Sequence, residues 1–281
     1  MLLIIGFIGF PIALSLALTL GFTGGLNQII ALIGQGIRPA DHWWGTMAGY
    51  QALFSDPRFN GDLQQTIVVT VVSTIVVLVL ALAIALIVRL HRGRIAQLLG
   101  AIIVVPMFVP VVISAWAIHT FYGGDGFVRS VAALLGLQAP TLTSTMWAVI
   151  IGSVWTSLPF ASLLVTSGMQ SIPDALIDAA RDAGAPMSRI VRTIMLPLAS
   201  TQLIIATTFT SIGILGSFTI PYFLGSNQPT MLGVEISNFL NAYNRPQQAV
   251  AMAFVIFVFA AGIAIAYVRA NLRGSATEAR A

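Results

Sequence analysis

The sequence predicts an all-α polytopic membrane protein, and three observations support this prediction. Hydrophobic residues make up 57% of the 281 positions and charged residues only 8%, whereas soluble domains carry about 25% charged residues. Uncharged apolar runs cover residues 66–88 and 249–268, and ~20 helical residues cross the ~30 Å hydrocarbon layer of a bilayer. The alternating ~10-residue segments of a membrane β-barrel are not seen.

The apolar segments predict six membrane spans in one transmembrane domain that covers residues 1–281. In chain order these spans are residues 2–19, 65–88, 98–121, 143–166, 198–220 and 248–268. The first segment has neither the positively charged start nor the small-residue cleavage site of a signal peptide. We therefore expect it to be retained as a span.

The arginines predict the orientation of the chain, because cytoplasmic loops are enriched in positive charge. Nine fall on one side of the six predicted spans: Arg89, Arg92, Arg94, Arg181, Arg189, Arg192, Arg269, Arg273 and Arg280. Four fall on the other side: Arg38, Arg58, Arg129 and Arg245. Both termini are therefore predicted to be cytoplasmic. This scatter also explains the net charge of +4 better than nucleic-acid binding does.

Two missing residue types limit the chemistry of the chain. It has no cysteine, which excludes disulfides, iron–sulfur clusters and thiolate metal sites. It has no lysine, so it lacks the residue that a Walker A loop places on nucleotide phosphates. His42, His91 and His119 are far apart in sequence. We predict no catalytic residue, no metal site and no cofactor, and we expect a partner protein to hydrolyse any ATP.

The loop of residues 171–197 is the least membrane-like part of the chain, and its pattern predicts a helix, a break and a second helix. Ser171 is the expected N-cap and Gly184 the expected helix end. An acidic stripe is expected from Asp174, Asp178 and Asp182, and an apolar side from Ile172, Leu176, Ala179, Ala180 and Ala183. Pro186 would open the second helix and Pro197 would bend the chain before the fifth span. By this pattern the helix either lies on the membrane surface or is gripped by another protein.

The same loop resembles the EAA loop of ABC importer permeases, whose pattern is Glu-Ala-Ala-x3-Gly-x9-Ile-x-Leu-Pro. The single departure is an aspartate at position 178 in place of glutamate. The resemblance implies a coupling helix that docks on a cytoplasmic ATPase subunit. The implied coupling residues are Asp178, Ala179, Ala180, Arg181, Gly184, Ala185, Ile194, Leu196 and Pro197.

This resemblance implies a type I ABC importer (MetI-like) permease fold in a bacterial inner membrane. It also implies four further chains: a second, different permease, two ABC ATPase subunits and an extracytoplasmic solute-binding protein. Residues 216–225 and 229–233 resemble the polyamine branch, which implies a polyamine-like or related small charged solute. A sugar-importing permease of the same fold is the alternative. A self-contained secondary carrier is less favoured, because the sequence shows neither inverted repeats nor charges at mid-span.

Proline breaks in the spans, and the polar and aromatic residues near them, indicate where a solute would pass. The candidate pathway residues are Trp116, His119, Trp155, Ser157, Ser217, Phe218 and Tyr222. Asp125 and Glu235 fall in predicted outside loops, and we expect both carboxylates to be solvated.

Overall fold

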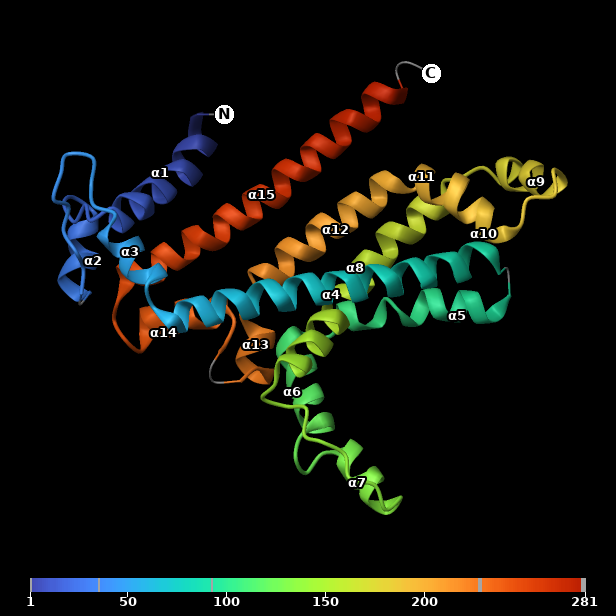
Figure 1. Cartoon of the computed structure of the whole chain (residues 1–281), viewed down its shortest axis with the longest axis horizontal. Helices are drawn as coiled ribbons and strands as arrows, with labels where there is room; N and C mark the ends of the chain where they lie inside the picture. The colour runs from blue at the N-terminus through green and yellow to red at the C-terminus, as the bar shows by residue number, and fades with distance from the viewer. Residues whose placement is uncertain (1, 35, 92, 227–228, 279–281) are drawn as a thin grey trace.

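The computed structural model describes residues 2–34, 36–91, 93–226 and 229–278, and this part of the chain contains helices but no strand (Figure 1). Two arginines used to orient the chain, Arg92 and Arg280, lie outside the described residues. The helices follow the order α1 Leu2–Thr19, α2 Asn27–Ile33, α3 Ala48–Phe54, α4 Pro57–Leu90, α5 Arg94–Ile102, the 3₁₀ helix η1 Val105–Phe108, α6 Val111–Tyr122, α7 Phe127–Leu134, α8 Met146–Gln170, α9 Asp174–Asp182, α10 Met187–Ile190, the π-helix η2 Val191–Met195, α11 Leu196–Leu198, α12 Ser200–Leu215, α13 Thr219–Leu224, α14 Leu232–Asn241 and α15 Pro246–Glu278.

Three helices are long and apolar enough to cross a membrane: α4, α8 and the segment Pro246–Ala270 of α15. Two bent helix pairs raise this number to five if each pair is one span, and the apolar stretch Gly6–Thr19 of α1 is shorter. Each predicted segment coincides with helix, while the count of six spans stays a prediction.

The predicted span of residues 98–121 is broken, at the prolines from which breaks were expected. The chain breaks between Arg94–Phe108 and Val111–Leu134, whose axes differ by 105°. Pro110 precedes α6 directly; it has no N–H to donate and its ring clashes with the preceding turn. As a result α6 packs against α13 and α8, and α7 beyond it extends away from the other helices (Figure 1).

The core lies where α4, α8 and α12 pack together. Small side chains at the contact let the helices approach closely. The buried cluster consists of Val77, Ala81 and Ala85 of α4, Ala161, Val165 and Met169 of α8, Ala206 of α12, and then Ile172, Ile177, Ile190, Met195 and Ala199. The loop after α8 is therefore packed onto the same core as the membrane helices.

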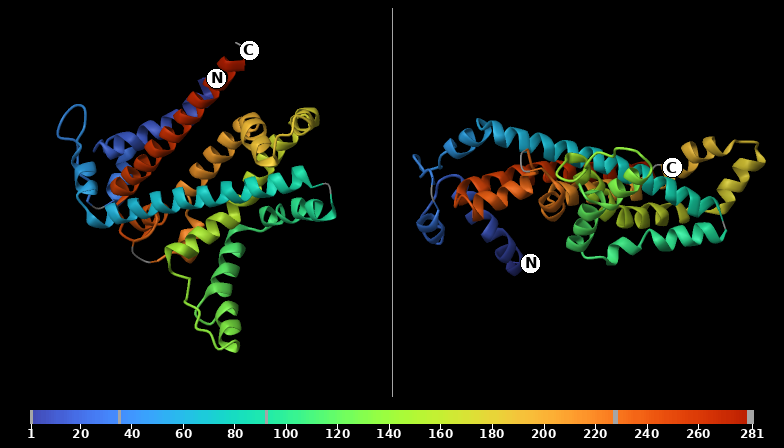
Figure 2. Two further views of the ribbon diagram at one scale, coloured as in Figure 1. Left: turned by 45° about the vertical axis from the view of Figure 1, so that its right-hand side comes forward. Right: turned by 90° about the horizontal axis from the view of Figure 1, so that it is seen from below.

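Helix α4 is the longest element and contains neither glycine nor proline between Asp62 and Arg89. Its 34 residues correspond to about 51 Å at ~1.5 Å per residue, which exceeds the ~30 Å hydrocarbon layer. Figure 2 shows α4 running straight along the molecule, with α5 folded back beside its C-terminal half.

The N-terminal end of α4 holds the chain that leads into α14. The carboxylate of Asp62, which is only 3% exposed, accepts a hydrogen bond from the Thr230 N–H at 2.7 Å. The Thr66 hydroxyl accepts one from the Leu232 N–H at 2.9 Å. Two backbone donors next to the start of α14 thus find partners on α4, as buried amides require.

The prediction that Glu235 is a solvated loop residue is wrong. Glu235 lies in α14 and is 6% exposed. Its carboxylate accepts a hydrogen bond from the Asn238 side-chain amide at 3.1 Å. The residue is buried because α14 packs against both α15 and α4, a long-range arrangement that the local sequence does not encode. Asp125, in contrast, is exposed.

The start of α15 is joined to the end of α1 by one buried side chain. The Gln247 amide group donates to the carbonyls of Leu18, Thr19 and Arg38 at 3.3, 3.4 and 3.1 Å. Its carbonyl oxygen accepts from the Arg38 N–H at 2.8 Å. Helices α1 and α15 therefore lie side by side (Figure 1).

Candidate functional site

The helix of the predicted coupling loop is α9, and it begins two residues later than the sequence suggests. Ser171 is not its N-cap: it is the C-cap residue of α8, and its hydroxyl donates to the Gly168 carbonyl at 2.9 Å. Pro173 occupies the N-cap position. The reason is that a residue before proline avoids helical backbone angles, so Ile172 cannot belong to the first turn.

The apolar residues of α9 divide between two faces, whereas the sequence suggested one. Ile177 is 4% exposed and belongs to the core cluster together with Ile172, and Ala180 packs against it. On the outer face Leu176 is 46% exposed, and the neighbouring alanines at positions 179 and 183 are also exposed. Spacings of three and four residues place these three side chains along one strip of the helix.

Gly184 ends α9 in the left-handed conformation, with φ of +79°. Its N–H donates to the Arg181 carbonyl at 2.8 Å, and the Ala185 N–H donates to the Ala180 carbonyl at 3.0 Å. These bonds form the Schellman arrangement, in which glycine avoids the steric cost of a side chain. A Cβ built on Gly184 has nothing within 4 Å, so the turn faces open space.

The chain after Gly184 returns to the core through α10, η2 and α11. Ile194 and Leu196 are half-buried against the core cluster, and Pro197 is exposed. The segment Met187–Leu198 then meets α12 at 69°. The Ile-x-Leu-Pro end of the motif thus contains two packing residues and a bend, and the π-helix η2, which is wider than an α-helix, overlaps its first two residues.

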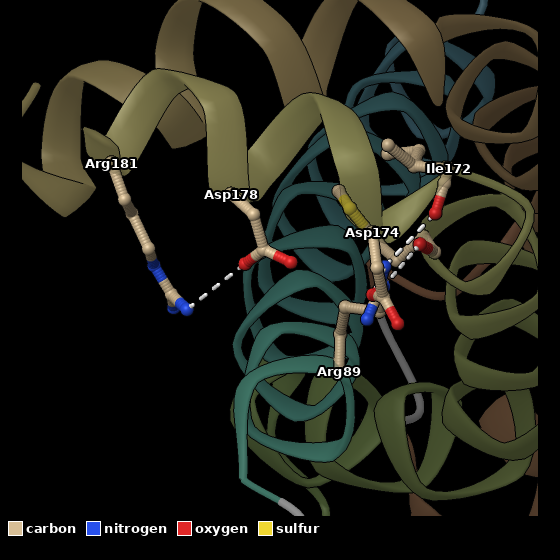
Figure 3. Close-up of polar contacts among 6 residues, drawn as sticks. Arg89, Ile172, Asp174, Asp178 and Arg181 are labelled. Atoms are coloured by element: carbon tan, nitrogen blue, oxygen red, sulfur yellow. Dashed lines mark hydrogen bonds and ion pairs between the residues drawn. The ribbon is translucent and has the colours of Figure 1, made fainter. Parts of the chain in front are cut away.

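Arg89, at the end of α4, lies beneath α9 and reaches three acceptors (Figure 3). Its Nε donates to the Met169 carbonyl at 2.9 Å. Its Nη2 donates to the Ile172 carbonyl at 2.9 Å and to the Asp174 carboxylate at 2.5 Å. From the sequence, Arg89 was expected only to mark the cytoplasmic side of the membrane. Its position at the end of a span was the one sequence feature that indicated this second role.

Asp178 and Arg181 form a weaker ion pair on the solvent side of α9. Their nearest atoms are 3.7 Å apart, and both side chains are about half exposed or more. A pair of this kind contributes little to stability because water screens it. Both groups remain available to another protein.

The predicted pathway residues separate into three groups instead of one. Trp155 of α8 lines a cavity of about 340 Å³ together with Ser114 and Tyr122 of α6. Trp116 and His119 stack on each other at 5.9 Å and do not line that cavity. A third group is on and next to α13, where Phe218 and Tyr222 stack at 5.1 Å.

The serines predicted for the pathway, Ser157 and Ser217, are half-buried. Two polar atoms near the groups above, the Ser114 hydroxyl and His119 Nδ1, are buried without a hydrogen-bond partner in the described chain. Within the described residues no three histidine, aspartate or glutamate side chains are grouped as metal ligands.

A comparison with protein families identifies the chain. The family model of binding-protein-dependent transport system inner membrane components matches residues 80–272, which include α8, α9 and the motif that follows. The chain belongs to this family. It is a multi-pass membrane component of a transport system and not an enzyme, and its EAA-loop resemblance is confirmed at the level of the family.

Members of the family with known roles differ in what they transport. The trehalose/maltose permease MalF of Thermococcus litoralis is 33% identical over 57% of this chain and 57% of its own length. The sulfoquinovosyl glycerol permease SmoG of Agrobacterium fabrum is 27% identical over 78% of this chain and 74% of its own length. The spermidine/putrescine permease PotB of Haemophilus influenzae is 30% identical over 56% of this chain and 59% of its own length.

Solved structures of importer permeases share the fold. A bacterial alginate ABC transporter in complex with an alginate pentasaccharide-bound periplasmic protein has a chain that matches with a TM-score of 0.71 at 19% identity. That match covers 79% of this chain and 81% of the other. The MetNI methionine transporter matches with a TM-score of 0.59 at 21% identity, over 76% and 94% of the two chains. At these identities the structures support the fold alone, and the predicted type I importer fold is confirmed.

Proposed function

We propose that this chain is a permease subunit of an ATP-driven importer, that it forms half of the translocation pathway, and that α9 couples it to a cytoplasmic ATPase. The observation that carries the proposal is the outer strip of α9. Leu176, Ala179 and Ala183 are apolar, exposed and small toward the open turn at Gly184. Small side chains let a partner's surface approach closely, and Asp178 and Arg181 beside them can fix its register.

The opposite face of α9 supports the same role. Ile177 is buried in the cluster that also contains residues of α4, α8 and α12. A helix that lay on the membrane surface would direct its apolar face toward lipid, whereas the buried face of α9 meets protein. Force applied to the outer strip therefore reaches the membrane helices through packed side chains.

The proposed complex contains a second permease chain, two ATPase subunits and an extracytoplasmic binding protein. One chain with a single coupling loop supplies one docking site, so two permeases are needed for two ATPases. The fold match to the alginate transporter, which was solved with its periplasmic protein, is consistent with this composition.

For the solute, we favour an uncharged sugar over the polyamine-like solute that residues 216–233 imply. The cavity beside Trp155 is lined by aliphatic and aromatic residues, Ser114 and Tyr122, with no charged side chain. Aromatic faces with a few hydroxyls suit a sugar ring, whereas a polyamine would need partners for several positive charges. Uptake of labelled maltose and labelled spermidine by the assembled transporter tests this choice, and spermidine uptake alone would overturn it.

The coupling role is tested with two matched glycines. Gly136 ends α7 as Gly184 ends α9: its φ is +70°, a Cβ there also has nothing within 4 Å, and the Leu137 N–H donates to the Ala132 carbonyl at 2.8 Å. Valine at either position meets the same left-handed strain of about 1–2 kcal/mol. Only Gly184→Val places a side chain next to the docking strip.

We expect Gly184→Val to reduce ATP-dependent uptake and co-purification of the ATPase at least tenfold. Gly136→Val is expected to keep both near the unmodified level. Equal behaviour of the two variants would reject the coupling assignment, because it would show that strain alone explains any loss.

A further inference from the structure

The end of α4 carries a buried arginine that joins three helices. The Arg89 side chain is only 12% exposed, although it lies at a helix end where a flexible cation would ordinarily extend into water. It is held instead by the carbonyls of Met169 and Ile172 and by the carboxylate of Asp174. These acceptors belong to the end of α8, the connecting residues and the first turn of α9.

The geometry suits arginine specifically. Its planar guanidinium donates in fixed directions from several nitrogens, so one side chain serves acceptors on two sides. Met169 lies in the last turn of α8, where helix carbonyls lack partners and carry partial negative charge. Asp174 lies in the first turn of α9, where a carboxylate is favoured for the opposite reason. Arg89 thus connects two helix ends of opposite polarity.

The surroundings of Arg89 are polar and open. A cleft of about 410 Å³ on one side is lined by Arg89, Leu90, Asp174, Ile177, Asp178 and Arg181. A second cleft of about 320 Å³ is lined by Arg89 and residues 170–174. Leu86 and Leu90 of α4 pack against the core cluster that contains Ile172 and Ile177, and the guanidinium adds directed polar contacts to this apolar packing.

We propose that Arg89 is a positioning residue of the transport cycle, which locks the first turn of α9 to α4 and α8 so that the three move as one body. This inference rests on the proposed coupling role of α9 and adds the element that passes its motion to α4. An arginine that only marks the cytoplasmic side would not need these contacts. The side chain of Arg94, the next described arginine, is exposed and has no hydrogen bond or ion pair within the described residues.

The test uses the assembled transporter in proteoliposomes, with ATP hydrolysis and uptake measured together. We expect Arg89→Gln to keep the complex assembled and hydrolysing ATP, while uptake per ATP hydrolysed falls at least tenfold. Arg89→Lys keeps the charge but not the fork of donors, and we expect an intermediate loss. The control Arg94→Gln removes an exposed arginine from the same predicted cytoplasmic loop and is expected to retain the ratio.

A second measurement reports the position of α9 relative to α4 and does not depend on transport activity. Because the chain contains no cysteine, spin labels at Val79→Cys on α4 and Asp182→Cys on α9 report one distance. We expect a single narrow distribution with Arg89 and a broad one with Arg89→Gln. An unchanged ratio together with an unchanged distribution would overturn the inference. If Arg89→Gln does not assemble, Asp174→Ala, which removes the α9 acceptor of Arg89 and leaves its two backbone acceptors in place, is subject to the same two criteria.

The two proposals fail in different ways. If Gly184→Val leaves uptake intact, α9 is not the coupling helix, and the role of Arg89 falls with it. If Gly184→Val abolishes uptake while Arg89→Gln behaves like Arg94→Gln, the docking role stands and the positioning role alone is rejected.

Discussion

Gly152 lies at the crossing of α8 and α13, where it allows the two helices to touch. A Cβ at this position would stand 2.7 Å from Leu224 Cδ1 and 2.8 Å from Ile220 Cγ2. Both neighbours are buried, so neither side chain has space to swing away. Gly152→Ala therefore combines a gain of about 0.5–1 kcal/mol in helix propensity with an overpacking cost of about 1–3 kcal/mol.

Gly262 provides the matched control for this prediction. It lies inside α15, is exposed, and a Cβ there has nothing within 4 Å. Gly262→Ala therefore keeps the propensity gain without the clash, and the difference between the two variants isolates the clash at about 1–3 kcal/mol.

The assay is thermal unfolding of the purified chain in detergent, followed by tryptophan fluorescence. We expect the Tm of Gly152→Ala to lie below that of Gly262→Ala by several degrees, about 2–4 °C for each kcal/mol. Equal Tm values for the two variants would refute the reasoning, because they would mean that α8 and α13 are not in contact as described.

Two further substitutions test the hydrogen bonds that join distant parts of the chain. Asp62→Ala should lower the free energy of unfolding by about 1.5–3 kcal/mol, because the buried N–H of Thr230 loses a charged acceptor. Asp62→Asn retains an acceptor oxygen and should cost less than half as much. Equal losses of the two variants in thermal unfolding would show that this hydrogen bond does not determine the stability. Gln247→Ala should lower the free energy of unfolding by about 1–3 kcal/mol, because the N–H of Arg38 loses its acceptor. Gln248→Ala, which removes a single long hydrogen bond of 3.5 Å, serves as the control. If both variants unfold at the same temperature, the stabilising role of Gln247 is rejected.

Composition and motif spacing were enough to predict the helical membrane fold and its family. Unbroken apolar runs have one physical explanation in a bilayer, because backbone groups there must be satisfied within the segment. The spacing from Asp178 to Pro197 then indicated the loop that we propose as the coupling loop. These features are local in sequence, which is why they could be predicted without coordinates.

The predictions that were wrong concern contacts between residues far apart in sequence. Alanines occur on both sides of α9, so the sequence could not decide which side faces protein; only the packing of Ile177 decides it. Glu235 is buried by contacts of α14 with α4 and α15, which no local pattern contains. The pathway residues of α6, α8 and α13 were grouped by polarity, but Trp155 meets the face of α6 that carries Ser114 and Ile118, and Trp116 does not line that cavity.

The unbroken length of α4 has a consequence for the timing of the transport cycle. Asp62 and Arg89 stand 27 positions apart in one helix, about 40 Å at ~1.5 Å per residue. A helix without glycine or proline has no internal hinge to absorb a displacement. We therefore expect the two ends of α4 to move together as one stiff rod and not one after the other.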